Sequence, residues 1–198
     1  VSAFAGQEGI HSAEHHHYNE RAVGEKMAAR AERVGGFLLG FSRFGPAKMR
    51  LAITVALEHM TAIMADELFS NAAVQRDMDP EHRKLWLWHA AEETEHKAVA
   101  FDVYQMVKGG ALRRSVALVV STFFLFLATG VLTAVFLWRD GEFFKFRNLK
   151  SIGKFFFKYK FLVNIVPAWF SFFRPGFHPW QHDNSAQLFA WKQQYAVA

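Results

Sequence analysis

Apolar residues recur along most of this chain at intervals of three and four, the spacing of one face of an α-helix. No stretch alternates polar and apolar residues as a half-buried strand does. Glycine pairs and prolines divide the pattern, because glycine favours helix ends and proline favours helix starts. The pattern predicts helices from the start of the chain to about Val34, from Pro46 to about Gln75, and from Asp79 to Gly109.

A long uncharged segment follows these helices. The sequence has no charged residue between Arg114 and Arg139, and residues 115–138 as a helix would reach about 36 Å, enough for a bilayer core of roughly 30 Å. The flanking arginines and Trp138 suit membrane interfaces. We expect the segment to insert into a membrane, across it or as a re-entrant or surface-lying hairpin bent near Thr129. The alternative is a central helix buried on all sides by its own protein.

Residues 142–173 combine many phenylalanines with interspersed lysines and arginines. This pattern predicts an amphipathic helix whose lysines reach lipid headgroups while its phenylalanines face the membrane. An ordinary surface helix with one apolar face is the alternative. We expect Pro167 to kink or end the helix, and residues 174–180 to be irregular.

Charge is distributed unevenly along the chain. Residues 1–110 contain 12 Lys and Arg against 15 Asp and Glu, whereas residues 111–198 contain 11 against 3. The aromatic residues of the basic half form apolar runs and are not spaced as stacking platforms for bases. A membrane surface is therefore the expected partner, and nucleic acid is not.

The chain contains 10 histidines and no cysteine, which excludes thiolate metal sites, iron–sulfur clusters and cysteine nucleophiles. Histidines and carboxylates are then the strong metal ligands available. Successive helix residues turn by about 100°, so Glu8, His11 and His15 fall within about 60° of one another on the first predicted helix. The third predicted helix carries an equivalent set: His89, Glu93 and His96.

A further candidate ligand, Glu58, lies in the apolar run 54–63 of the second predicted helix. A carboxylate buried there needs a cation or a proton to neutralise it. His15 and Glu92 are candidates for outer positions, next to the metal ligands, where each would hydrogen-bond to a ligand or to a water. Other titratable residues are expected away from the ligands: His59 at a helix interface, Glu95 pointing away, Glu14 and His17 in solvent, and His178, His182 and Asp183 in a hydrogen-bonded loop.

Di-iron and di-manganese bundles use one Glu from each of two helices and a Glu-x-x-His pair from each of two others. This chain supplies two pairs, Glu8 with His11 and Glu93 with His96, and one single glutamate, Glu58. One glutamate-bearing helix is lacking, and the abrupt start of the sequence leads us to expect it ahead of residue 1. The predicted fold is an all-α, ferritin-like helical bundle, first helix missing, with a hydrophobic, membrane-associated C-terminal extension.

Four stretches of the sequence resemble the bacterial family of predicted metal-dependent hydrolases. They are FAGQEGIH at 4–11, ALEHMTA at 56–62, WHAAEETEHK at 88–97 and FRPGFHPWQHD at 173–183. The similarity extends over nearly the whole chain. It implies a metal-dependent protein in which a further helix, carrying a Gly-Glu motif, precedes residue 1.

The spacing of the ligands also resembles that of di-iron enzymes of the p-aminobenzoate N-oxygenase type. These enzymes have a third histidine four residues before the last glutamate, and His89 has that place relative to Glu93. The resemblance implies that His89 is a ligand, whereas a core histidine bonded to a carbonyl is the alternative. The predicted metal ligands are Glu8, His11, Glu58, His89, Glu93 and His96.

We expect these residues to bind two iron ions, with manganese or zinc as alternatives. The predicted function is a di-iron or di-manganese oxidase or oxygenase that uses O2 and an electron donor to oxidise a small hydrophobic molecule. One alternative is a two-metal hydrolase, in which the ions lower the pKa of a bound water. The other is a non-catalytic, ferritin-like subunit of a membrane protein complex, which would have partner subunits.

Domain organisation and location follow from these expectations. The metal-binding bundle is expected at residues 1–110. Residues 111–198 are expected to form the apolar helix, the basic amphipathic helix and an irregular tail, packed on the bundle or on a membrane. We expect the protein on the cytoplasmic side of the bacterial inner membrane, integral or tightly peripheral, with the cytoplasm as the alternative.

Overall fold

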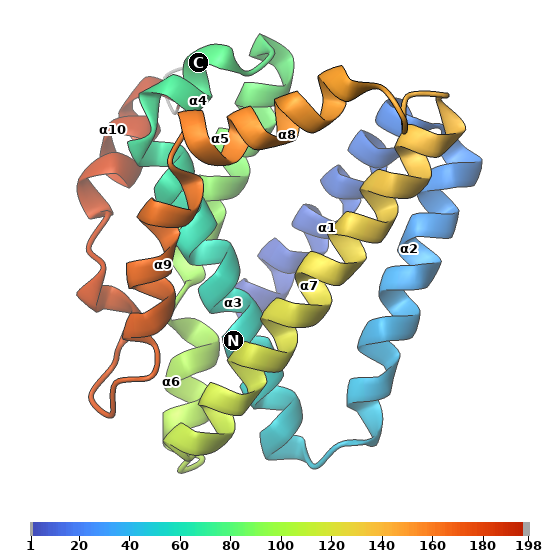
Figure 1. Cartoon of the computed structure of the whole chain (residues 1–198). Coiled ribbons are helices and arrows are strands. Elements are labelled where there is room, and N and C mark those ends of the chain that lie inside the picture. Colours follow the sequence, from blue (N-terminus) through green and yellow to red (C-terminus); the bar gives the residue numbers. More distant parts are fainter. Residues whose placement is uncertain (1, 196–198) are drawn as a thin grey trace.

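The computed structural model describes residues 2–195, apart from the side chains of residues 38, 39, 41, 42, 149, 154 and 195. The described chain consists of helices and loops without a strand, which confirms the all-α prediction (Figure 1). The helices are α1 (Ser2–Val23), α2 (Glu25–Gly40), α3 (Ala47–Ser70), α4 (Ala72–Asp77), α5 (Pro80–His96), α6 (Val99–Met106), α7 (Ala111–Arg139), α8 (Phe146–Lys158), α9 (Phe161–Ser171) and α10 (Ser185–Tyr195). Short 3-10 turns lie at Phe41–Phe44 and Pro179–Gln181. The relation to ferritin-like bundles stays a prediction.

Helices α1 and α2 form a hairpin. Gly24 adopts a φ of 83°, a left-handed conformation that glycine accepts readily, and the chain turns there so that α2 packs against α1 (Figure 1). The prediction of one helix from the start of the chain to Val34 is therefore wrong. The glycine pair Gly35–Gly36, which was expected to end that helix, lies inside α2.

Helices α3 and α5 begin where the sequence predicts. Pro46 is the residue that precedes α3. At the start of α5, a carboxylate oxygen of Asp79 accepts hydrogen bonds from the backbone N–H groups of Glu81 and His82, at 3.0 and 3.3 Å. These bonds satisfy N–H groups that have no partner within the helix.

Both of these predicted helices are interrupted before their expected ends. The second one stops at Asn71, whose side-chain oxygen accepts a hydrogen bond from Val74 N–H and so caps the short helix α4. The third one divides at Lys97–Ala98 into α5 and α6. The expected helices to Gln75 and to Gly109 are therefore each two helices.

Helix α7 is continuous and does not bend at Thr129, whose hydroxyl donates to the carbonyl of Leu125 at 2.8 Å. It is the one described helix that is long and apolar enough to cross a membrane, judged by length and composition. Only 17% of its most apolar 18-residue window is buried inside the described chain. The described residues therefore do not bury this helix on all sides.

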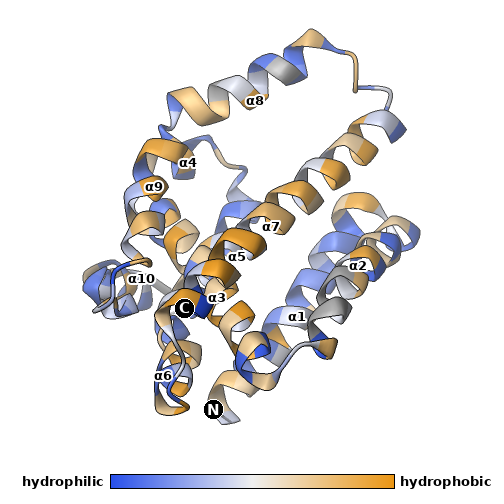
Figure 2. Ribbon diagram, turned by 60° about the horizontal axis from the view of Figure 1, so that its bottom comes forward, coloured by the Kyte–Doolittle hydropathy of each residue, from blue (hydrophilic) through white to orange (hydrophobic). Residues whose placement is uncertain are grey.

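The amphipathic helix expected at residues 142–173 is divided into α8 and α9. The division falls at Lys160, which adopts a φ of 53°, and Pro167 lies inside α9 without ending it. Residues 174–180 are irregular apart from the start of a 3-10 turn, as predicted. Figure 2 shows that α7 and α9 are largely apolar, whereas α8 carries both polar and apolar residues.

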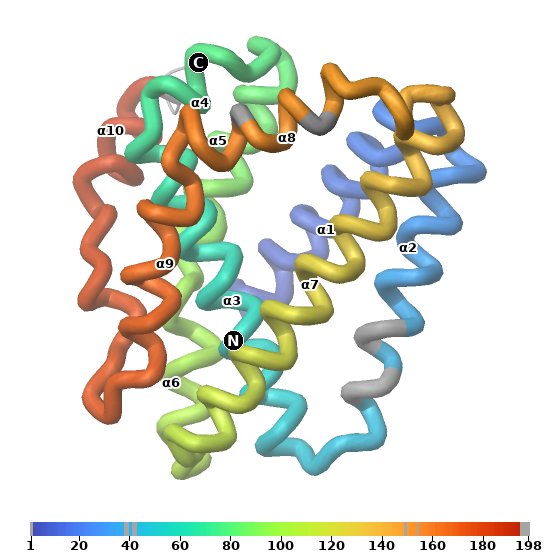
Figure 3. The backbone as a smooth tube through the Cα atoms, viewed as in Figure 1, coloured from blue at the N-terminus to red at the C-terminus, as the bar shows by residue number. Residues whose placement is uncertain are grey.

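The hydrophobic core forms around α3, which lies between α7 and α9 and also contacts α5 and α6 (Figure 3). The guanidinium of Arg114, at the start of α7, is buried and donates to the carbonyl oxygens of Phe172 and Arg174, both at 2.8 Å. The buried core residues include Val55, Ala56, Met60 and Ile63 of α3, Phe101 of α6, Leu118 of α7, Ile165 of α9, and Phe172 and Phe177 beyond it. Residues on both sides of position 110 thus share one core, and the expected division of roles between the two parts stays a prediction.

Candidate metal centre

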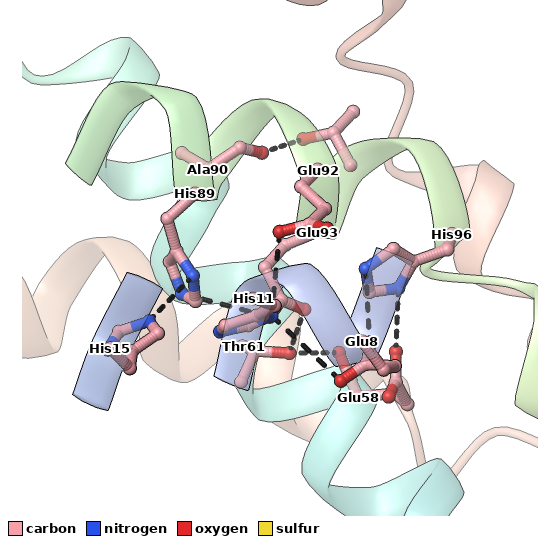
Figure 4. A network of polar contacts seen from close by, with 11 residues as sticks. Glu8, His11, His15, Glu58, Thr61, His89, Ala90, Glu92, Glu93 and His96 are labelled. Carbon is pink, nitrogen blue, oxygen red and sulfur yellow. Dashed lines mark hydrogen bonds and ion pairs between the residues drawn. The ribbon is translucent and has the colours of Figure 1, made fainter. Parts of the chain in front are cut away.

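Helices α1, α3 and α5 bring the predicted ligands together (Figure 4). Helix α3 has two sides: Ala56 and Met60 pack into the core, whereas Glu58 and Thr61 face α5. Intervals of three, four and seven along α1 and α5 place their ligands on single faces. The cluster comprises Glu8, His11 and His15 from α1, Glu58 and Thr61 from α3, and His89, Glu92, Glu93 and His96 from α5.

The cluster contains two adjoining groups of ligand atoms. The histidine group consists of His11, His15 and His89, and the carboxylate group consists of Glu8, Glu58 and His96. Within each group the ligand atoms lie within 4.8 Å of one another. Metal–nitrogen and metal–oxygen bonds are about 2.0–2.2 Å long, so small side-chain movements would let each group converge on one ion.

The histidine group is held by contacts between its own rings. His15 Nε2 lies 3.2 Å from His89 Nδ1, and the ring centroids of His11 and His89 are 4.4 Å apart. Burial is the largest cause that lowers the pKa of each ring, to about 4 for His11 and about 3 for His89. The three imidazoles are therefore neutral at pH 7, the form that binds a metal ion.

In the carboxylate group, His96 lies between two glutamates. Its Nδ1 is 3.1 Å from Glu58 Oε2, and its Nε2 is 3.4 Å from Glu8 Oε1. A metal-binding imidazole commonly donates its second N–H to a carboxylate, which fixes the ring and its tautomer. Glu58 can hold His96 in this way, so that His96 Nε2 and Glu8 face the same point.

Glu93 lies beside the histidine group. Its Oε1 lies 3.7 Å from both His11 Nδ1 and His89 Nε2, and its Oε2 accepts a 2.5 Å hydrogen bond from Thr61 Oγ1. Burial raises the pKa of Glu93 to about 7, although the Thr61 hydrogen bond opposes the shift. A carboxylate in this position would be stabilised by a cation bound at the histidine group.

Glu92 and His15, the two candidates for outer positions, both lie close to other ligand atoms. Glu92 Oε2 is 3.5 Å from His11 Nδ1, and burial raises the pKa of Glu92 to about 7. His15 belongs to the histidine group itself. Glu92 gives the cluster a fourth carboxylate from within the described chain. The additional helix expected ahead of residue 1 stays a prediction.

The cluster fits metal ions better than it fits a closed hydrogen-bond network. Among the described residues, the buried atoms without a hydrogen-bond partner include His11 Nδ1, His96 Nε2 and Glu92 Oε2. Each such atom costs about 1–3 kcal/mol in a folded protein. All three lie within 3.5 Å of another ligand atom, and one cation per group would satisfy His11 Nδ1 and His96 Nε2. Nitrogen and carboxylate donors without sulfur suit zinc, manganese or iron.

Aromatic rings that the sequence analysis did not single out enclose the cluster. Trp86 lies edge-on to both His15 and His89 with centroids 5.4 Å apart, and Phe4 lies 5.0 Å from the His96 ring. Trp86 stands three residues before His89 on α5. This three-residue spacing places Trp86 and His89 on the same side of α5, and it is the signal in the sequence that points to Trp86. Apolar walls of this kind lower the local dielectric constant and strengthen electrostatic interactions inside the site.

The remaining titratable residues lie away from the cluster, as expected. His59 stacks on Phe172, Glu95 accepts a hydrogen bond from Gln7, and Glu14 and His17 are exposed. In the C-terminal loop, His178 bonds to Asp102, His182 to Ser171, and Asp183 to Ser185. In the described part of the chain, none of these residues belongs to the two ligand groups.

An open groove of about 720 Å³ reaches the cluster from the side of α1 that faces α2. Glu8, His11 and His15 line it, together with His16 and Glu32, whose side chains are 2.9 Å apart. A small molecule can therefore approach the cluster from the α1–α2 hairpin.

The fold and the cluster define an all-helical protein with a carboxylate–histidine cluster that is able to hold metal ions. The chain belongs to the family described as predicted metal-dependent hydrolase, whose model matches residues 1–183. The matched range contains the whole cluster, and it confirms the family resemblance stated from the sequence. No curated protein and no solved structure matches the chain.

Proposed function

We propose that this chain is a two-metal hydrolase whose ions bind at the histidine group and the carboxylate group. The observation that carries the proposal is the convergence of three neutral imidazoles beside the carboxylate group, with Glu93 Oε1 3.7 Å from two of them. The description of the family supports the same class of reaction.

Bound divalent ions supply a Lewis acid for a carbonyl or phosphoryl oxygen and lower the pKa of water toward neutrality. The histidine group suits water activation best, because its ligands are uncharged, as in catalytic zinc sites with three histidines. The carboxylate group is anionic and offsets more of an ion's charge. It suits the binding and orientation of the substrate.

We assign Glu92 as the general base. Among the described atoms its Oε2 has no hydrogen-bond partner, and it lies beside the histidine group, 3.5 Å from His11 Nδ1. In the metal-free chain burial raises the pKa of Glu92 to about 7, and in the loaded enzyme this oxygen would accept a proton from water. Thr61 holds Glu93 Oε2 and thereby keeps Glu93 Oε1 directed at the histidines.

The groove favours a small polar substrate. Its lining includes the polar side chains of His16, Asn19 and Glu32 as well as Glu8 and His11 of the cluster. Carboxylic esters, phosphate esters and amides are the classes that two-metal sites hydrolyse with an activated water. The hydrophobic substrate expected from the sequence is the alternative proposal for this groove.

A di-iron oxidase or oxygenase is the second candidate. The four carboxylates of the cluster favour it, since glutamate-rich sites in helical bundles are typical of di-iron and di-manganese proteins. This function would require O2, an electron donor and an oxidisable substrate. The family description supports hydrolysis instead, so hydrolysis is our first proposal.

Hydrolysis and O2 consumption can be compared in the same preparations. Protein loaded with Zn²⁺, Mn²⁺ or Fe²⁺ is assayed with p-nitrophenyl acetate and bis(p-nitrophenyl) phosphate, and the Fe²⁺ form also in an oxygen electrode. We expect metal-dependent hydrolysis that Glu92→Gln reduces by about 100-fold or more. Glu14→Gln, an exposed change on α1, should leave the rate unchanged.

The other outcomes are informative. O2 consumption by the Fe²⁺ form, without hydrolysis by any form, would favour the di-iron enzyme. Bound metal with neither activity would favour a non-catalytic subunit. Equal hydrolysis by wild-type protein and the Glu92→Gln variant would remove the general-base assignment.

A further inference from the structure

Helix α7 exposes one apolar half to solvent. With about 100° between successive residues, its exposed apolar residues cover about half of the helix circumference. The other half contains Ala117, Leu118 and Ser121, which are buried. The exposed side includes Val120, Phe123, Phe124, Leu127, Val131 and Trp138. A contiguous apolar surface of this extent is uncommon on a monomeric soluble protein and marks an interaction site.

Exposed aromatic side chains also lie in the turn after α7 and at the far end of α8. Phe144 and Phe146 are 82% and 77% exposed, and Phe157 at the end of α8 is 85% exposed. The rings of Phe143 and Phe144 each lie 5.7 Å from the ring of Trp138. Tryptophan at the end of an apolar helix is typical of the membrane–water interface.

Helix α8 adds a basic face beside these aromatic residues. Arg147, Lys150 and Lys158 are exposed and fall within about 80° of one another around the helix. Arg147 also pairs with Glu142 at 2.6 Å and Lys158 pairs with Asp77, so Lys150 is the main basic residue that this face offers to anionic lipid. Ile152 and Phe156 lie on the opposite side of α8 by the same spacing. Helices with one basic and one apolar face lie in the plane of a membrane surface.

We propose that the exposed face of α7, the turn at Phe143–Phe144 and helix α8 dock onto a phospholipid bilayer that contains anionic headgroups. Residues 111–198 carry 11 Lys and Arg against 3 Asp and Glu, so anionic lipid complements this half of the chain. A second copy of the chain would bring an equally basic rim to the same surface, and the like charges would oppose pairing. This docking is independent of the proposed hydrolase activity.

The contacts of α7 favour an orientation along the membrane over one that crosses it. Its buried half packs against α3. At its far end Arg139 Nη1 donates to the carbonyl of Val23, in the turn of the α1–α2 hairpin, at 2.9 Å. Helices α1 and α2 carry charges every few residues and cannot enter lipid, so lipid cannot surround α7 while these contacts persist. The insertion expected from the sequence thus becomes shallow docking, and the cytoplasmic side stays a prediction.

Co-sedimentation with vesicles tests this docking. The protein is mixed with phosphatidylcholine vesicles and with vesicles that also contain phosphatidylglycerol, and we expect clearly tighter binding to the second kind. Phe144→Ser and Phe157→Ser should each weaken binding roughly tenfold. Lys150→Ala should weaken binding to the anionic vesicles about fivefold. Phe189→Ser is the matched control, because Phe189 is 63% exposed on α10, outside the proposed surface.

Three results would overturn the proposal. They are no binding of wild-type protein to anionic vesicles, equal binding by the Phe144→Ser/Phe157→Ser variant, and a lipid-free dimer that this variant dissociates in analytical ultracentrifugation. The last result would assign the surface to a second copy of the chain. Circular dichroism and metal content of each variant show whether the fold is retained. Lys150→Ala changes an exposed side chain only, and it keeps the proposal testable if the phenylalanine variant does not fold.

Discussion

Ionisation of Glu93 without a bound cation should destabilise the folded protein, and Glu93→Gln should remove that effect. Burial raises the pKa of Glu93 from 4.5 to about 7. The folded state therefore binds more protons than the unfolded state between these two values, and stability falls as the pH rises through this window. The difference between the two pKa values corresponds to roughly 3 kcal/mol, which is fully expressed at pH 8 and absent at pH 4.

Urea unfolding of chelator-treated protein at pH 5 and pH 8 measures this free energy. Glutamine keeps an acceptor for Thr61 Oγ1, so the comparison isolates the charge. At pH 8 we expect Glu93→Gln to be more stable than wild type by roughly 3 kcal/mol, or about 6–12 °C in Tm. At pH 5 the two proteins should differ much less, and the exposed Glu14→Gln should show no such pH dependence.

Two results would refute this reasoning about Glu93: an equal stability difference at both pH values, or a variant that is less stable than wild type at pH 8. Divalent ions provide a second check. They should stabilise wild-type protein at pH 8 by binding the folded state, and they should stabilise the Glu93→Gln variant much less.

Three other substitutions test separate parts of the structure. His89→Ala should change the visible spectrum of Co²⁺-loaded protein and keep the helical fold, since alanine favours helices; lower thermal stability with an unchanged spectrum would make His89 a core residue only. Lys97→Met should lower the free energy of unfolding by roughly 2–4 kcal/mol in urea, because the buried ammonium donates a 2.7 Å bond to Asn184 Oδ1; a loss below about 1 kcal/mol would contradict this. Gly109→Ala should lower the free energy of unfolding by roughly 1–3 kcal/mol, because a Cβ there would lie 2.2 Å from the Tyr104 ring. An unchanged Tm would show that the ring moves freely.

The sequence predicted which residues share a helix face, but not how the faces turn toward one another. The spacing along α1 and α5 pointed to Glu8, His11, Glu93 and His96, and the structure brings these residues together. The approach of Glu92 Oε2 to His11 Nδ1 depends on the rotation of α5 relative to α1. A one-dimensional pattern contains no information on that rotation.

The breaks within the predicted helices were missed for a similar reason. Asn71 Nδ2 donates to the carbonyl of Tyr159 at 2.9 Å, and Lys97 Nζ donates to the carbonyl of His182 at 2.6 Å. These partners are more than 80 residues away in the sequence. Local helix propensity cannot include contacts of this range, whereas the helix start at Asp79 depends on a local cap and was predicted correctly.

The apolar segment of α7 could be recognised from the sequence, but its surroundings could not. A segment that is apolar on every side has no periodicity, so the sequence does not distinguish a buried helix from one that meets lipid. The structure adds the packing: Leu118 is buried against the core, while Phe123 and Leu127 are exposed.

Metal analysis of the purified protein tests the central claim most directly. Inductively coupled plasma mass spectrometry after loading and desalting gives the number of ions per chain. We expect about two divalent ions per wild-type chain, loss of both in Glu93→Ala, and full retention in Glu14→Ala. Less than one ion per wild-type chain, or two ions in Glu93→Ala, would contradict a two-metal site that depends on Glu93.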